Sequence, residues 1–263
     1  MSGVHSVSLC AVKMTAFRRF DNGTESGKAV MSGFLWRHGG NPFLVTNWHN
    51  VTGINPNTEI PMGDFTPTHF SCEFKCEVIE RGTGRAGTKE LSLFDADGNS
   101  QWIEHPDGRL VDVVAIPFQY ELPENHQFKF INEQDYEVEW HPRIGDDGFI
   151  VGFPEGFSGL HTTPIWKRGS VATEPSLNHQ DRPMFLLDTI GNAGLSGSPV
   201  IGRGSGVFNK GENGDGWTGT QVIGTWENFI GIYSGRMSSE GIGSQLGRVW
   251  KASVLEEIFH TID

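Results

Sequence analysis

Residues 70–78, with the sequence FSCEFKCEV, alternate apolar and polar side chains. Successive side chains of a β-strand point to opposite faces, so this period of two predicts a strand with one buried face. Shorter apolar runs occur at 33–36, 43–46 and 148–151, and 35 glycines and 13 prolines are spread through the chain between such runs. Many short strands with glycine-rich turns favour an all-β fold, either a sandwich or a barrel.

A convincing helical pattern occurs only near the C-terminal end. Ser253 is followed three residues later by Glu256, which is the pattern of a capping box. Apolar side chains recur there at helical spacing, namely Leu255, Ile258, Phe259 and Ile262. We therefore expect an amphipathic C-terminal helix that docks on the β core.

The charge and cysteine content narrow the range of partners and locations. The 263 residues include 32 acidic and 20 basic side chains, a formal net charge of −12, which repels phosphate backbones and anionic lipid. Neither nucleic acid nor a membrane is therefore an expected partner. No apolar run approaches the ~20 residues of a spanning helix, and the first residues lack the basic and apolar regions of a signal peptide. Three cysteines are too few for a disulfide scaffold, so we expect a cytoplasmic location.

The apolar stretch 43–51, FLVTNWHNV, runs directly into His49. A neutral imidazole is the natural proton carrier near pH 7, and the end of a strand would fix its position. The alternative is a surface or hydrogen-bonded structural histidine, of the kind that most of the ten histidines must be.

Asp112 interrupts the apolar run 111–118, VDVVAIPF. An unpaired buried carboxylate is costly, so this side chain lies either at the solvent edge of a strand or inside with a hydrogen-bond partner. A functional interpretation requires a histidine that the carboxylate can orient.

Ser196 lies in the stretch 191–200, GNAGLSGSPV, among residues too small to shield it. A serine becomes a useful nucleophile when a base takes its proton and backbone N–H groups stabilise the oxyanion, and small neighbours permit both. The alternative is a tight glycine-rich turn between two strands.

Base, acid and nucleophile follow in the order His49, Asp112, Ser196, which is the order of chymotrypsin-type enzymes and not that of subtilisins or α/β-hydrolases. With these motifs the chain resembles the trypsin-like serine peptidase family, of the bacterial cytoplasmic type, and is distantly similar to Deg-type proteases without a PDZ domain. The resemblance covers roughly residues 30–253, and the segment 194–199 is its most specific part. Other matching segments are 32–36, 45–51, 112–116, 149–154 and 168–171.

The resemblance implies a fold of two six-stranded antiparallel β-barrels with a C-terminal α-helix. Residues 1–125 would form the barrel that carries His49 and Asp112, and residues 126–263 the barrel that carries Ser196, together one peptidase domain. The implied activity is that of a serine endopeptidase that acts on polypeptides through an acyl-enzyme, without metal or cofactor. A regulatory protein partner stays open.

The same resemblance implies roles for further residues. The backbone N–H groups of Gly194 and Ser196 would form the oxyanion hole, and Ser234 would lie beside the carboxylate of Asp112. Extended substrate would pair with the strand that contains Tyr233, Ser234, Gly235 and Arg236.

The pocket for the side chain before the scissile bond would involve Ile190, Gly235, Arg236 and Arg248. Ile190 stands where a trypsin-like pocket has an aspartate, so basic side chains are not expected there. Two alternatives remain: Arg248 points into the pocket and pairs with Glu or Asp, or Ile190 floors a shallow apolar pocket for Val, Ala or Leu.

Three rival interpretations come from other classes of protein. The first is a metal site, because three side chains that can bind a metal lie within eight residues, namely His69, Cys72 and Cys76. However, the alternation of the strand puts the two cysteines on the apolar face and His69 on the other face. A pseudo-protease would keep the fold and bind peptides without cleaving them. An esterase would use the same three residues on small acyl substrates.

Overall fold

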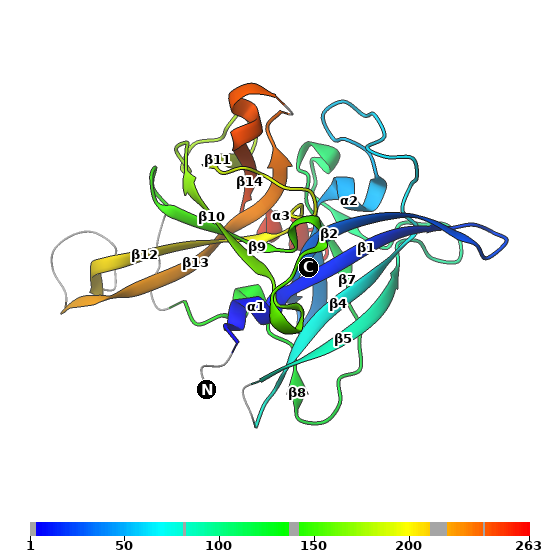
Figure 1. The fold of residues 1–263 in the computed structure, drawn as a ribbon, viewed down its shortest axis with the longest axis horizontal. Helices are drawn as coiled ribbons and strands as arrows, with labels where there is room; N and C mark the ends of the chain where they lie inside the picture. The colour runs from blue at the N-terminus through cyan, green and yellow to red at the C-terminus, as the bar shows by residue number, and fades with distance from the viewer. Residues whose placement is uncertain (1–3, 81–82, 137–141, 211–219, 239) are drawn as a thin grey trace.

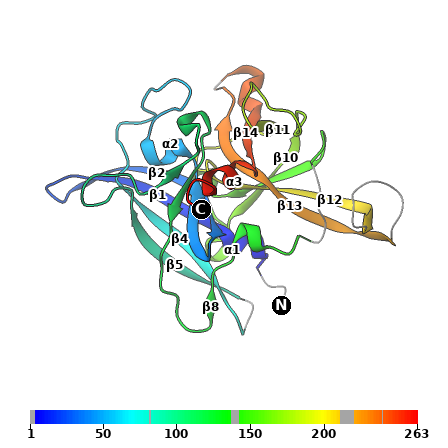
Figure 2. The same ribbon diagram turned by 180° about the vertical axis from the view of Figure 1, so that it is seen from behind.

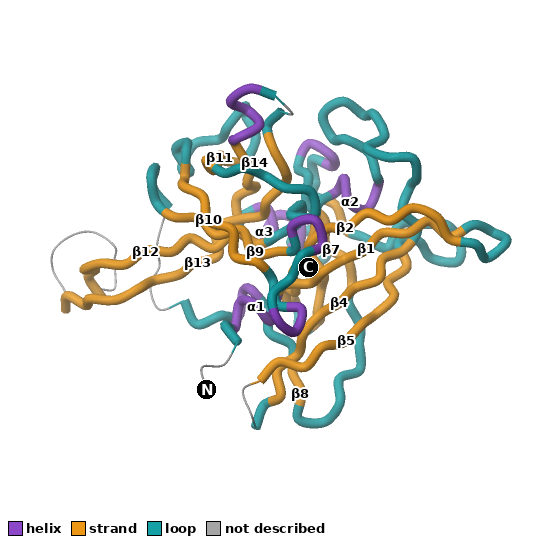
Figure 3. The backbone as a smooth tube through the Cα atoms, viewed as in Figure 1, coloured by secondary structure: helices purple, strands orange, loops and turns teal. Residues whose placement is uncertain are grey.

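The computed structural model describes residues 4–80, 83–136, 142–210, 220–238 and 240–263. Strands make up most of the secondary structure, with short helices between them (Figure 3). The strands form two antiparallel systems, one from each half of the chain (Figure 1). The all-β fold class expected from the sequence is therefore confirmed.

The first system is an eight-stranded sheet with the order β5-β4-β1-β2-β3-β7-β6, and β8 pairs with β4. Its strands are β1 (Ala11–Arg19), β2 (Glu25–His38), β3 (Asn41–Thr46), β4 (His69–Val78), β5 (Thr83–Ser92), β6 (Ile103–Glu104), β7 (Val114–Pro117) and β8 (His126–Gln127).

This first sheet differs from the expected six-stranded barrel, because its end strands β5 and β6 are not paired with each other. It nevertheless curls around one buried cluster to which β1, β2, β3, β4 and β7 all contribute. Phe74 of β4 and Phe118, just after β7, meet edge to face with ring centroids 5.6 Å apart. Side chains thus fill the interior of the sheet, although its two end strands are not paired by backbone hydrogen bonds. The end strand β6 has only two residues.

The alternation predicted for 70–78 holds in β4 only in part, because Lys75 is buried and donates to the carbonyl of His161, and Val78 is half-buried. Phe70, Cys72, Phe74 and Cys76 are all buried in the cluster of the first sheet. Burial raises the pKa of the Cys72 thiol to about 12. His69 is also buried, but it stacks on Phe17 and lies 3.4 Å from a carboxylate oxygen of Glu25. Within the described residues, no group of three His, Cys, Asp or Glu side chains is arranged to hold a metal ion.

The second system is a closed six-stranded barrel, β10-β11-β14-β13-β12-β9. Its strands are β9 (Asp147–Gly152), β10 (Ile165–Val171), β11 (Met184–Asp188), β12 (Pro199–Lys210), β13 (Thr220–Arg236) and β14 (Leu246–Lys251). The pairing of β9 with β10 completes the ring. The hairpin of β12 and β13 extends beyond the barrel (Figure 1).

The helices are short. The α-helices are α1 (Ser6–Cys10), α2 (Trp48–Thr52) and α3 (Val254–Phe259), and 3₁₀ turns occur at Gly108–Leu110, Ile131–Glu133, Pro154–Gly156, Leu160–Thr162 and Gly241–Gln245. No helix in the described ranges is long and apolar enough to cross a bilayer.

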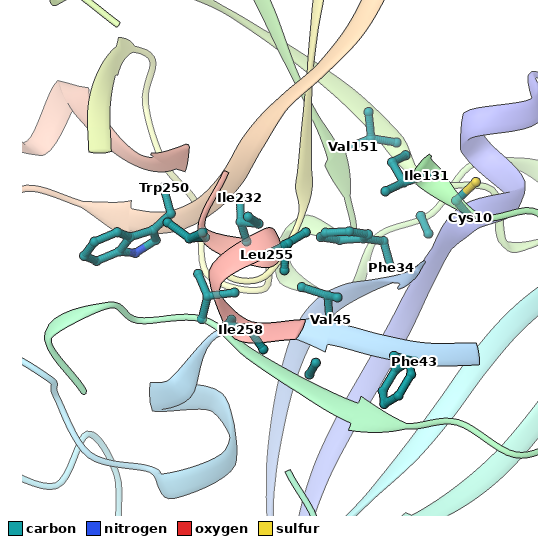
Figure 4. Close-up of a cluster of buried hydrophobic side chains, with 14 of the residues drawn as sticks. Cys10, Phe34, Phe43, Val45, Ile131, Val151, Ile232, Trp250, Leu255 and Ile258 are labelled. Atoms are coloured by element: carbon teal, nitrogen blue, oxygen red, sulfur yellow. The ribbon is translucent and has the colours of Figure 1, made fainter. Parts of the chain in front are cut away.

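Helix α3 is the amphipathic C-terminal helix expected from the sequence, and it lies between the first sheet and the barrel (Figure 2). Leu255 and Ile258 are buried in a cluster that also contains Val45 of β3 and Ile232 of β13 (Figure 4). Phe259 packs edge to face on Phe43 at 4.9 Å. The helix therefore holds the two halves of the chain together.

Two details of the expected helix are wrong. The side chain of Ser253 makes no capping hydrogen bond, because its backbone is already helical and its carbonyl accepts from the N–H of Glu256. Ile262 lies beyond the last turn of the helix and is 48% exposed.

Candidate active site

Strand pairing brings His49 and Asp112 together. Strand β3 ends at Thr46, which is paired with Val114 at the start of the antiparallel strand β7. The chain that leaves β3 enters helix α2, where His49 lies in the first turn, and Asp112 comes two residues before β7 begins. Both side chains are thus placed at the same edge of the first sheet, although they are far apart in the sequence.

The carboxylate of Asp112 is buried, with 1% of the residue exposed, and it is fully engaged. Its Oδ2 lies 2.7 Å from Nδ1 of His49 and accepts a hydrogen bond of 2.5 Å from Oγ of Ser234. Its Oδ1 accepts the backbone N–H of His49 at 2.9 Å. The interpretation of Asp112 as a residue at a solvent edge is therefore wrong, and these partners offset the cost of burying the charge.

The contact with Asp112 also determines what the imidazole can do. A carboxylate can only accept, so Nδ1 of His49 donates, and Nε2 of the neutral ring is left as an acceptor. The backbone bond from His49 N to the same carboxylate fixes the first turn of α2 against Asp112. The ring is therefore oriented to take a proton at Nε2.

Ser196 lies in the turn 191–198 that leads into β12 of the barrel. Its carbonyl accepts hydrogen bonds from the N–H of Ser32 at 3.0 Å and from Nδ2 of Asn50 at 3.2 Å. The next residue, Gly197, has φ +85°, and a Cβ atom there would lie 2.1 Å from the carbonyl oxygen of Ser32. A glycine is thus required where the serine turn meets the first half of the chain.

Two backbone N–H groups of the turn are free. Within the described residues, neither Gly194 N–H nor Ser196 N–H has a hydrogen-bond acceptor. The carbonyl of Ala193 accepts from the N–H of Glu155 at 2.7 Å, and the carbonyl of Leu195 accepts from Ser198. Because a trans peptide places its N–H opposite its C=O, both free N–H groups point away from these bonded carbonyls. They remain available to an oxyanion.

Glu155 is a functional candidate that the sequence analysis missed. It adopts a left-handed conformation with φ +51°, which is uncommon for a residue other than glycine. This conformation accompanies the bond from its N–H to Ala193, and its side chain accepts a hydrogen bond from Asn192 at 3.2 Å. The only signal in the sequence was the turn-forming neighbours Pro154 and Gly156.

His49 and Ser196 both line one cavity of about 510 Å³. No hydrogen bond joins the hydroxyl of Ser196 to the ring of His49 in the described part of the chain. Such bonds are often long before a substrate binds. The cavity is walled by residues 55–58 and Met62 from the first half and by 191–193 and 233–238 from the second.

The expected pocket residues divide into two groups. Tyr233, Ser234, Gly235, Arg236 and Arg248 line the cavity of His49 and Ser196. Ile190 does not line it and is 64% exposed, so the expectation that Ile190 floors this pocket is wrong. Ile190 follows the end of β11, where the chain has already left the barrel wall.

A second cavity of about 320 Å³ also reaches His49 and Ser196. Its lining is mainly apolar and comes mostly from the first half of the chain, including Ala29, Val30, Met31, Met62, Phe65 and Pro67. The two reactive side chains therefore lie between a cavity of mixed polarity and a mainly apolar one.

No protein-family model and no curated protein matches this chain. Among solved structures, the chain is similar to an HtrA-type protease with a tripeptide, at 15% sequence identity and a TM-score of 0.48. The alignment covers 100% of this chain and 64% of that chain. A likeness at this level assigns no activity to this chain.

Proposed function

We propose that this protein is a serine endopeptidase, with Ser196 as nucleophile, His49 as general base and Asp112 as the group that orients the imidazole. One observation carries the proposal. The hydrogen-bonded pair of Asp112 and His49 opens into the same cavity as Ser196, whose turn offers two free N–H groups.

In the proposed reaction, Oγ of Ser196 attacks the carbonyl carbon of the scissile bond while Nε2 of His49 takes the hydroxyl proton. The oxyanion accepts the N–H groups of Gly194 and Ser196, and the negative charge of Asp112 stabilises the imidazolium. His49 then returns the proton to the leaving amine, and an acyl-enzyme remains. Water, deprotonated by His49, releases the acid and restores the hydroxyl of Ser196.

Polypeptide substrates are favoured by an open strand segment beside Ser196. Pairing of β12 with β13 ends at Ile232, and the pairing of β13 with β14 skips Ser234 and Gly235. A Cβ atom on Gly235 would lie 3.9 Å from Oγ of Ser196. An extended peptide that pairs with this segment would pass directly over the nucleophile.

The test is labelling with a fluorophosphonate probe, which reacts with activated serines. We expect wild type to be labelled stoichiometrically and Ser196→Ala to remain unlabelled, with loss of peptide hydrolysis by several orders of magnitude. Equal labelling of the two proteins would refute the proposal. Labelling at Ser196 with hydrolysis of small esters but of no peptide would favour the esterase, and a folded wild type that is never labelled would favour the pseudo-protease.

A further inference from the structure

The cavity beside Ser196 has an unusual charge for this molecule. The protein carries a formal charge of −12, yet the lining of this cavity contains two arginines, Arg236 and Arg248, and no aspartate or glutamate. In an acidic protein, a concave surface whose described lining has two arginines and no carboxylate repels anions less than carboxylate-bearing surfaces do. The cavity therefore favours an anionic ligand.

Arg248 lines this cavity, and within the described residues it forms no ion pair. It belongs to β14 and is largely withdrawn from water, and burial lowers the pKa of its guanidinium. One terminal nitrogen donates to the carbonyl of Ser234 at 3.4 Å, and Nε is buried with no hydrogen-bond partner among the described residues. Among the described residues, no carboxylate lies within ion-pair distance of Arg248, whereas the exposed Arg168 and the half-buried Arg203 each hold one.

Such a cation is costly unless a ligand compensates it. Asp112 interacts with it electrostatically but is already engaged by His49 and Ser234. The hydroxyl of Tyr233 is a second buried polar group that has no hydrogen-bond partner in the described part of the chain. It lies beside Gly191, where a Cβ atom would be 2.1 Å from it. Both Tyr233 and Gly191 line the same cavity. This wall therefore offers a ligand two kinds of hydrogen-bond donor, the guanidinium of Arg248 and the hydroxyl of Tyr233.

We propose that the cavity receives an acidic side chain, Glu or Asp, of the residue before the scissile bond, and that the guanidinium of Arg248 is its charge partner. This inference rests on the proposed function and specifies its substrate class. A guanidinium binds a carboxylate through two parallel hydrogen bonds, and the neutral amide of Gln cannot replace that pair. Arg236, on the strand segment next to Gly235, adds positive charge to the same wall.

The experiment compares peptide substrates of equal length that differ only in the residue before the cleaved bond: Glu, Asp, Gln, Leu or Lys. We expect wild type to cleave after Glu or Asp at least ~10-fold faster in kcat/KM than after Gln, with Lys the poorest. In Arg248→Gln the ratio of Glu to Gln should fall to about 1, and in Arg248→Lys part of the preference should return. The control Arg168→Ala removes an exposed arginine of the same barrel and should leave the ratio unchanged.

A second measurement keeps the inference separate from the proposed function. Calorimetry on Ser196→Ala follows the binding of a peptide that ends in Glu and of its counterpart that ends in Gln, and we expect the first to bind at least ~10-fold more tightly. If fluorophosphonate labelling fails, the proposed function fails, and this binding comparison alone decides the inference. Wild type that is labelled but prefers Leu or Lys, equal binding of the two peptides, or a Glu preference that survives in Arg248→Gln would each overturn it.

Discussion

The two sides of the candidate site are held by different kinds of contact. On the side of the first sheet, Asp112 and His49 are fixed by side-chain hydrogen bonds in a buried setting. On the side of the barrel, Ser196 sits in a turn whose position depends on backbone groups and on Gly197. The acid–base side, Asp112 and His49, thus depends on which side chains are present. The nucleophile side, the turn with Ser196, depends on the path of the main chain.

This difference separates two ways of losing activity. A substitution on the acid–base side removes a chemical group and leaves the strands β3 and β7 paired. A substitution of Gly197 in the serine turn keeps every reactive group, and we expect it to move the N–H donors of Gly194 and Ser196. Ser234 connects the two sides, because it belongs to β13 of the barrel but donates to Asp112.

The largest effect is expected for His49→Ala, which removes the general base. Turnover of a peptide substrate should fall by roughly 10⁴-fold or more, while the free N–H groups still allow residual catalysis. The control is His260→Ala, an exposed histidine just after α3, which should keep wild-type turnover. Similar activity in the two variants would show that His49 is not the general base of the reaction.

An intermediate effect is expected for Gly197→Ala. The added methyl group would meet the carbonyl of Ser32, so the turn has to shift and the oxyanion donors move, and kcat should fall by roughly 10²-fold. Gly23→Ala is a matched control, because Gly23 has a similar φ of +80° but open space around its Cβ position. It carries only the conformational penalty, of about 1–2 kcal/mol, and should stay active. If Gly197→Ala kept full activity, the turn would be more tolerant than its contacts imply.

The smallest effect is expected for Ser234→Ala, which removes one of the hydrogen bonds to Asp112 and leaves the others. We expect kcat/KM to fall by roughly 10-fold, in line with one hydrogen bond to a charged group. Ser92→Ala, which removes an exposed hydroxyl bonded to the carbonyl of Phe94, is the control. A loss as large as that in His49→Ala would mean that the barrel controls the acid–base side and that the two sides are not separable.

Local patterns in the sequence predicted much of this arrangement. The alternation at 70–78 places Phe70, Cys72, Phe74 and Cys76 in the core as expected. The apolar runs that lead into His49 and away from Asp112 became the paired strands β3 and β7. The candidate roles of His49 and Asp112 could be predicted from the sequence because each residue lies in a short motif. The residues that shape each motif are adjacent in the sequence.

Other features depend on contacts between distant parts of the chain. Whether the first sheet closes depends on the pairing of β5 with β6, and no local pattern encodes that pairing. The helix at 254–259 formed as predicted, but the backbone of Ser253 is helical and its side chain makes no capping hydrogen bond. Ile190 is exposed because β11 ends at Asp188 and the chain has left the strand by residue 190. The sequence around Ile190 does not show where this strand ends.

By itself, the sequence determined the all-β class, the segments that carry His49, Asp112 and Ser196, and the order in which they occur. Those features arise from side-chain period and from short motifs, which act over a few residues. Only the tertiary structure decided that Asp112 is buried, that the N–H of Glu155 holds the carbonyl of Ala193 and that Arg248, which forms no ion pair with any described residue, lines the cavity of Ser196. Burial and pairing are properties of groups that meet across the fold, and their energies exist only once both partners are in place.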